Sequence, residues 1–306
     1  MGAKQRTFSL SKVLLTSASI GFIILCFLDV NGFIEASRSG FDLFVRNVLP
    51  VLFPFFFITG LMVESGLRGR TGTVLFLSYM CGFPASVKIL SELYSKGKIT
   101  RRKSIILATA TSTVSPIFVI ATVGIGLFSS VMVGIIIFVA MVLGALLNGL
   151  LYYFILRKKR DNKDFANVTV QKDIRPPDSA SIVATSLQNA LQSIMAVGGM
   201  IVVFYILTQQ LANVLSLSSG MNTVLAGVME MTAGVFTSTS VLVGVSGIVA
   251  LIIVTAILTF GGLSVGMQGS LFFRKFGMSF WFYLVYKVTH VIFAVAVVSL
   301  LTVVFL

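Results

Sequence analysis

Charged side chains are scarce in this sequence, at 11% of its residues, whereas 57% of the residues are hydrophobic. The apolar residues fall in runs too long for the core of a soluble domain, which excludes a soluble enzyme. A membrane-spanning helix needs about 20 mostly apolar residues. Runs of that length are Leu10 to Leu28, Val131 to Leu156, Ile194 to Leu211 and Phe280 to Leu306, with interrupted runs near Val48 to Leu67, Ile105 to Phe128 and Ile248 to Phe273. The sequence therefore predicts an all-α polytopic membrane protein.

Cysteine and histidine are also rare, with 2 and 1 copies. Cys26 and Cys81 lie in separate apolar segments without metal-ligating neighbours, which argues against a disulfide framework and a zinc site. The sequence has no phosphate-binding loop, no nucleophile with its base and no pair of catalytic carboxylates, so we expect neither a cofactor nor enzymatic activity. The rival hypothesis is a membrane enzyme acting on lipid or cell-wall precursors. It would use Glu230 or His290 as general base and needs a second polar group within hydrogen-bonding reach.

The formal net charge of +13 comes from basic residues that lie between the apolar runs. They do not form a basic face with interleaved aromatic residues, so no nucleic-acid partner is expected. The positive-inside rule places such clusters in the cytoplasm. The clusters are Lys4 to Lys12, Lys96 to Lys103, Arg157 to Arg175 and Arg274 to Lys275. We therefore expect a cytoplasmic N-terminus and a first helix that is retained, since its run is long and lacks an Ala-x-Ala cleavage site.

This topology predicts a re-entrant hairpin early in the chain. The first helix exits, Asp29 to Asp42 turns outside, and a helix near Pro50 to Gly66 returns. The segment Thr71 to Ser95 must then begin and end inside, with an apolar and a polar half on either side of the break "GFP" at residues 82–84. Such backbone is tolerated at membrane depth only where protein or water surrounds it.

The order helix, hairpin, broken helix, helix occurs twice in this interpretation. The first broken helix is interrupted at "TSTVSP", residues 111–116, and the second at Gly261-Gly262. The second copy starts from the opposite side, so we predict inverted repeats, which in transporters place the substrate site where the broken elements meet. The expected organisation is an N-terminal helix and external turn (1–40), a first repeat (41–156), a basic cytoplasmic loop (157–185) and a second repeat (186–306).

Glu230, in "GVMEMTAGV", is the only acidic residue after Asp178 and lies in an apolar context. An ionisable group within the membrane is costly, which makes it a candidate functional residue. The alternative is a structural role as a partner for Lys88, Lys287 or a helix N-terminus.

Lys88 follows the break at residues 82–84 by about one helical turn, so its ammonium could meet a bound anion. Two alternatives are open. Lys88 could extend to the cytoplasmic interface, or it could pair with Glu92 four residues later on the same helical face.

Hydroxyl groups and freed carbonyls at "TSTVSP" could coordinate a solute or cation. They could instead only satisfy the backbone at a kink, and the glycines of "FGGLSVGMQ" could serve close helix packing. His290 could relay a proton, or be a buried hydrogen-bonded group that shares a helical face with Lys287. The candidate substrate-binding residues are Gly82, Pro84, Lys88, Ser112, Thr113, Ser115, Glu230, Thr232, Ser264, Gln268 and His290.

The motifs "GFPASVKILSELYSKGKIT", "TATSTVSPIFVIATVGIGLF", "MEMTAGV", "GGLSVGMQ" and "KVTH" occur in this order. They resemble the sporulation integral membrane proteins of the YlbJ type, which contain a nucleoside-recognition or Gate domain. The positions that match are Gly82, Pro84, Lys88, Pro116, Glu230, Ser264, Gln268 and His290. The sequence departs from the pattern at "TSTVSP", where the family is rich in asparagine, at Gly266-Met267, where it has His-Ala, and at Lys287, where it has arginine.

The resemblance implies a multi-pass protein of a bacterial cell membrane or forespore membrane that moves a small anionic metabolite, with dipicolinate as the candidate. We expect a membrane transporter or channel, with H⁺ or Na⁺ as the coupled ion. The alternatives are a transporter of nucleosides or related solutes and a non-transporting scaffold for sporulation or envelope remodelling. The sequence leaves the oligomeric state open.

Overall fold

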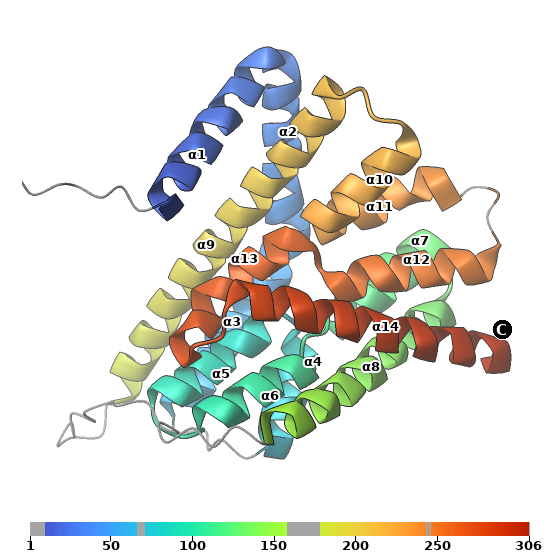
Figure 1. Cartoon of the computed structure of the whole chain (residues 1–306). Helices are drawn as coiled ribbons and strands as arrows, with labels where there is room; N and C mark the ends of the chain where they lie inside the picture. The colour runs from blue at the N-terminus through green and yellow to red at the C-terminus, as the bar shows by residue number, and fades with distance from the viewer. Residues whose placement is uncertain (1–9, 66–70, 158–177, 243, 245, 306) are drawn as a thin grey trace, which may run out of the picture.

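The computed structural model describes residues 10–65, 71–157, 178–242, 244 and 246–305. Every regular element within these ranges is a helix (Figure 1), which confirms the all-α prediction. Four helices are long and apolar enough to cross a membrane, or up to five with one bent pair. They are Val131–Arg157, Ser179–Val214, Gly247–Phe276 and Phe280–Phe305, and the bent pair is Thr16–Leu28 with Val30–Val48. The basic clusters expected at the N-terminus and after Arg157 lie largely outside the described residues.

The chain turns sharply at Asp29, where α1 (Leu10–Leu28) ends and the next helix bends away by 109°. The turn expected over residues 29–42 is confined to Asp29, because helix α2 (Val30–Leu43) begins at once. Its external location stays a prediction. The Asp29 carboxylate caps α2 by accepting a 2.9 Å hydrogen bond from the N–H of Gly32. α2 continues through a π-helical segment, η1 (Phe44–Val48), into α3 (Leu49–Glu64).

A hairpin of two short helices, α4 (Thr71–Cys81) and α5 (Ala85–Ser95), follows. Its tip needs glycine, because Gly82 has φ +72° and a Cβ there would lie 2.9 Å from the Cα of Ser115. The next helix is broken: α6 (Arg101–Ala110) ends before Pro116, and the chain resumes as helix over residues 116–128. The elements that complete this half are η2 (Phe118–Ile125), α7 (Gly126–Phe128) and α8 (Val131–Arg157).

The second half has the same order of elements. It consists of α9 (Ser179–Val214), the hairpin α10 (Ser219–Met229) and α11 (Met231–Leu242), the broken helix α12 (Gly247–Phe260) and α13 (Gly262–Phe273), a 3₁₀ turn η3 (Arg274–Phe276) and α14 (Phe280–Phe305). The break in the helix falls at Gly261 and Gly262, which both have positive φ. Two left-handed residues in succession cannot continue a helix, and only glycine adopts them at little cost.

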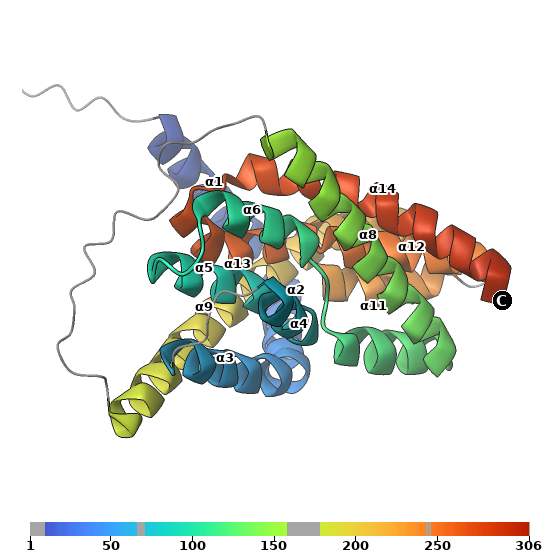
Figure 2. The same cartoon turned by 90° about the horizontal axis from the view of Figure 1, so that it is seen from below.

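The two halves run in opposite senses. In Figure 1 the helix from α2 to α3 descends through the molecule, while α9 ascends beside it. In this view the α4–α5 hairpin lies in the lower part of the molecule and α10–α11 lies in the upper part. Helices α8 and α14 pack against each other and cross when seen from below (Figure 2). The residue boundaries predicted for the repeats stay a prediction.

Aromatic side chains fix the tip of the first hairpin to the second half. The ring of Phe83 lies 5.7 Å from that of Tyr283 on α14, and Tyr283 stacks on Phe273 of α13 at 5.6 Å. On the outside, large apolar side chains such as Phe27, Trp281 and Val303 are more than three-quarters exposed. Such side chains face lipid in a membrane protein. Functional polar groups are therefore expected in the protein interior.

Candidate functional site

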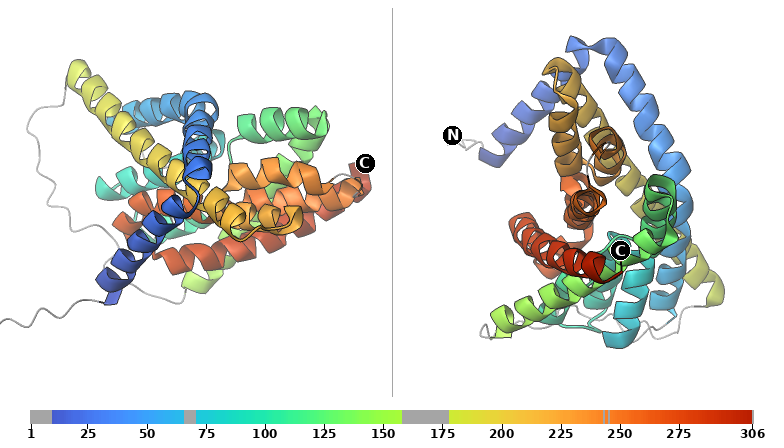
Figure 3. Two further views of the ribbon diagram at one scale, coloured as in Figure 1. Left: turned by 90° about the horizontal axis from the view of Figure 1, so that it is seen from above. Right: turned by 90° about the vertical axis from the view of Figure 1, so that its right-hand side faces the viewer.

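The breaks of both hairpins and both broken helices converge in the middle of the molecule. The N–H of Phe83 donates a 2.7 Å hydrogen bond to the carbonyl of Thr113, which joins the first hairpin to the first broken helix. In the second half, a Cβ at Gly262 would lie 3.2 Å from the Cα of Glu230. The α10–α11 and α12–α13 breaks are therefore in contact as well. Figure 3 shows the packing of these helices from two further sides.

A cavity of about 100 Å³ lies at this convergence. Five of the predicted substrate-binding residues line it: Pro84, Ser115, Glu230, Thr232 and Gln268. The other lining residues are Asn47, Val48, Leu52, Cys81, Phe83, Val114, Ile117, Phe118, Thr122, Ile201, Met231 and Val265. The lining is thus mostly apolar, with a few polar groups that could orient a small solute.

Glu230 is 1% exposed and lies at the junction of α10 and α11. Its Oε2 accepts a 2.7 Å hydrogen bond from the N–H of Ala233, and the N–H and hydroxyl of Thr232 also interact with the carboxylate. Glu230 therefore caps the N-terminus of α11, whose partial positive charge favours a carboxylate. Glu230 thus has the structural role at a helix N-terminus that was the alternative to a functional one, yet the same side chain lines the cavity.

Gln268 and Ser264 lie one turn apart on α13. The amide nitrogen of Gln268 donates a 3.1 Å hydrogen bond to the hydroxyl of Ser264. Gln268 lines the cavity, whereas Ser264 does not. Ser264 consequently orients the Gln268 side chain without lining the cavity itself.

Lys88 does not line the cavity. Its ammonium pairs with Glu92 at 2.9 Å and lies 5.3 Å from the centre of the Phe56 ring. Residues four apart share a helical face, so the pairing alternative is the one the fold adopts.

The residues before Ser115 form hydrogen bonds to neighbouring elements through their backbone carbonyls. Ser112 and Thr113 offer their carbonyls to Lys287 and Phe83, at 2.9 Å and 2.7 Å. The hydroxyl of Thr111 donates to the carbonyl of Leu107 at 2.8 Å, which is the backbone role left open for this motif. Gly82 packs against Ser115 at the tip and does not line the cavity.

His290 lies away from the cavity, on α14. Its Nε2 is 3.0 Å from the carbonyl of Met141 on α8, so the imidazole joins two scaffold helices. Asn148 of α8 adds a second link, because its Nδ2 donates to the carbonyl of Tyr286 at 3.0 Å. His290 is thus a buried hydrogen-bonded group, and the described residues contain no cluster of three or more His, Cys, Asp or Glu that could hold a metal.

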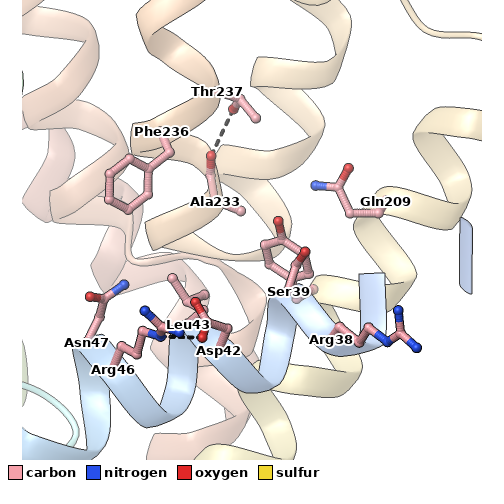
Figure 4. A pocket seen from close by; sticks show the side chains of 11 residues that line it. Arg38, Ser39, Asp42, Leu43, Arg46, Asn47, Gln209, Ala233, Phe236 and Thr237 are labelled. Atoms are coloured by element: carbon pink, nitrogen blue, oxygen red, sulfur yellow. Dashed lines mark hydrogen bonds and ion pairs between the residues drawn. The ribbon is translucent and has the colours of Figure 1, made fainter. Parts of the chain in front are cut away.

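A larger basin of about 580 Å³, the upper basin, adjoins the cavity. Figure 4 shows its wall, where Arg38, Asp42 and Arg46 project from α2 and η1 and Arg46 pairs with Asp42. Asn47 lines both the basin and the central cavity. The sequence-based prediction missed Arg38 and Asp42 because it assigned residues 29–42 to a turn. The spacing of four residues places the three charged side chains on one face only if the segment is helical.

A second basin of about 310 Å³ lies along α5, beyond the hairpin tip in the chain. It is lined by Lys88, Ser91, Glu92, Asn189, Gln192, Ser193, Ala196, Leu271, Phe272 and Lys275. Two basic side chains and one acidic side chain line it, a balance of +1. The upper basin has the same balance, from Arg38 and Arg46 against Asp42. Positive charge in a recess raises the local concentration of anions.

The chain is 27% identical over 285 residues to the sporulation integral membrane protein YlbJ of Bacillus subtilis (strain 168). The match covers 76% of this chain and 69% of that protein. No family model and no solved structure matches the chain. The similarity confirms the resemblance expected from the motifs and, with the spanning helices, supports a multi-pass integral membrane protein.

Proposed function

We propose that this YlbJ-like integral membrane protein transports a small, polar, anionic metabolite through the cavity between the two hairpin tips. One observation carries the proposal: four interruptions of helices converge on a cavity lined by Glu230, Thr232 and Gln268, and two polar basins lie along the helices that form it. In transporters, discontinuous helices form substrate sites near the bilayer midplane. The basins are the approaches to that site from the two sides of the membrane.

The size of the cavity indicates a closed conformation. A volume of about 100 Å³ accommodates only about three water molecules, and ligand pockets are usually about 300 to 1,000 Å³. A metabolite enters when the hairpin tips separate. The bond from Phe83 to Thr113 makes the first hairpin move with the first broken helix.

Anionic solutes suit the charges along this path. Each basin has one more basic than acidic side chain. α5 begins at Ala85, directly after Pro84 in the cavity wall, so the positive end of this helix faces the cavity. An anion would therefore meet favourable potential in the basins and at the centre.

Glu230 would repel an anion in so small a space if it were ionised. We therefore propose that the solute binds together with a proton on Glu230. The protonated acid donates a hydrogen bond to the solute, while its other oxygen still accepts from the N–H of Ala233. Glu230 would then couple transport to a proton.

Dipicolinate is the leading candidate cargo, because it is a small dicarboxylate and the similar Bacillus subtilis protein is a sporulation protein. The test is a thermal-shift screen of the purified protein against dipicolinate, other dicarboxylates, nucleosides and amino acids over a range of pH. Uptake of any hit into proteoliposomes with an imposed pH gradient follows. We expect a dicarboxylate to stabilise the wild type more strongly at acidic pH.

Glu230→Gln mimics the protonated side chain, so this variant should bind the anion without the pH dependence and should fail to use a proton gradient. Glu35→Gln, an exposed carboxylate on α2, is the matched control and should behave like the wild type. Stabilisation by nucleosides alone would favour the nucleoside alternative. A flat screen with a well-folded protein would contradict transport and favour the scaffold alternative.

A further inference from the structure

Lys287 is a buried cation on α14 that the proposed transport mechanism does not use. It is 2% exposed, in a segment long and apolar enough to cross the membrane. No carboxylate in the described part of the chain forms an ion pair with it; the described pairs are Arg46–Asp42, Lys88–Glu92 and Lys96–Glu64. An uncompensated charge at such a depth is costly, so other groups must stabilise it.

Those groups are two backbone carbonyls from two different breaks. The Nζ of Lys287 donates to the carbonyl of Ser112 at 2.9 Å and to the carbonyl of Thr259 at 2.6 Å. Ser112 follows the end of α6, and Thr259 lies in the last turn of α12. The ring of Phe83, at the tip of the first hairpin, lies 5.7 Å from the same nitrogen. One ammonium thus contacts the first hairpin and both broken helices.

The chemistry of this site is that of a cation site. The C-terminal end of a helix carries unpaired carbonyls and a partial negative charge. In transporters with broken helices, such carbonyls coordinate a coupling Na⁺. Here the Lys287 ammonium fills the position between the two carbonyl ends.

We propose that Lys287 is a built-in cation that replaces a coupling metal ion and joins the two broken helices. The consequence is a protein whose folded state and transport need no Na⁺, K⁺ or Li⁺. The transport half of this inference rests on the proposed function, whereas the structural half concerns the protein without solute. Glu230, on the other side of the Gly261-Gly262 break, then remains as the carrier of the mobile proton.

The test compares melting temperatures of the purified, solute-free protein in NaCl, KCl, LiCl and choline chloride at equal ionic strength. The wild type should melt at the same temperature in all four salts. Lys287→Ala should melt at least about 5 °C lower in choline chloride, because two buried carbonyls lose their donor. It should partly recover in at least one metal chloride, because the vacated position can then hold that ion.

Lys287→Arg keeps a cationic donor and should retain most of the stability without added metal. Arg274→Met, which removes an exposed cation directly after the end of α13, should change neither the melting temperature nor its dependence on the salt. Wild-type protein stabilised by Na⁺ or K⁺ over choline would overturn the inference without any variant. It would also be overturned if Lys287→Ala melted like the wild type, or if no cation restored the variant.

The transport arm measures uptake of the identified solute in sodium-free and sodium-containing proteoliposomes, with equal rates expected. Uptake that requires Na⁺ would contradict the built-in cation and leave the proposed function standing. Because the melting experiment contains no solute, its outcome does not depend on whether the protein transports anything. The two proposals can therefore fail separately.

Discussion

The N–H of Phe83 donates a 2.7 Å hydrogen bond to the carbonyl of Thr113, so the tip of the first hairpin is bonded to the break in the following helix. Through this bond, a backbone N–H without a partner in the hairpin is paired with a backbone carbonyl without a partner in the broken helix. The adjacent Gly82 makes the close approach possible.

Gly82→Ala should destabilise the protein. The new Cβ would lie 2.9 Å from the Cα of Ser115, and φ at this position is +72°. Left-handed backbone and overpacking together should cost about 2 to 4 kcal/mol of unfolding free energy. Gly97→Ala is the matched control, because its φ is +64° and nothing lies within 4 Å of its Cβ. Denaturant unfolding in detergent measures both, and equal losses would refute close contact at Gly82.

Substitution of Glu92 should destabilise the protein more than substitution of its ion-pair partner Lys88. Lys88 is almost fully buried, whereas the Glu92 side chain is 21% exposed. Glu92→Met would leave a buried ammonium unpaired and should cost about 3 kcal/mol. Lys88→Met, which leaves the more exposed partner, should cost less than about 1.5 kcal/mol, and the double substitution should resemble it. Unfolding titrations of the three variants decide, and a larger loss for Lys88→Met would contradict the structure.

The corner between α1 and α2 predicts a capping effect. Asp29 accepts hydrogen bonds from the N–H of Gly32 at 2.9 Å and from the Asn213 amide at 3.1 Å. Asp29→Ala should lower the unfolding free energy by about 1 kcal/mol, whereas Asp29→Asn should retain most of it, because asparagine caps equally well. If the melting temperatures of the two variants coincide, the cap contributes nothing.

Substitutions of His290 and Gln268 should affect different properties, namely the stability of the protein and its affinity for the solute. His290→Leu removes the contact with the Met141 carbonyl and should cost about 1 kcal/mol of stability, with little change in solute affinity. Gln268→Leu removes a polar group from the cavity wall and should weaken binding about tenfold, or about 1.4 kcal/mol. Titration of the best solute from the screen measures affinity. Lost binding in His290→Leu at intact stability would place the imidazole in the solute path.

The membrane class, the interruptions of the helices and the presence of one acidic residue in an apolar hairpin could be predicted from the amino-acid sequence. These follow from local physical chemistry: apolar runs span lipid, and Gly-Gly and Pro favour the end of a helix, although α3 continues through Pro54. The one local error was at residues 29–42, where a polar segment next to Asp29 was assigned to a turn although it packs as helix α2 against α9.

The partners of the buried charged side chains, in contrast, depend on how the helices pack. Glu230 is stabilised by N–H groups within three residues, yet Lys287 is stabilised by carbonyls 175 and 28 residues away in the chain. No spacing rule links such positions, because their contact depends on how the two halves pack. The same packing brings Pro84, Ser115, Glu230 and Gln268 to one cavity and leaves Lys88 and His290 outside it.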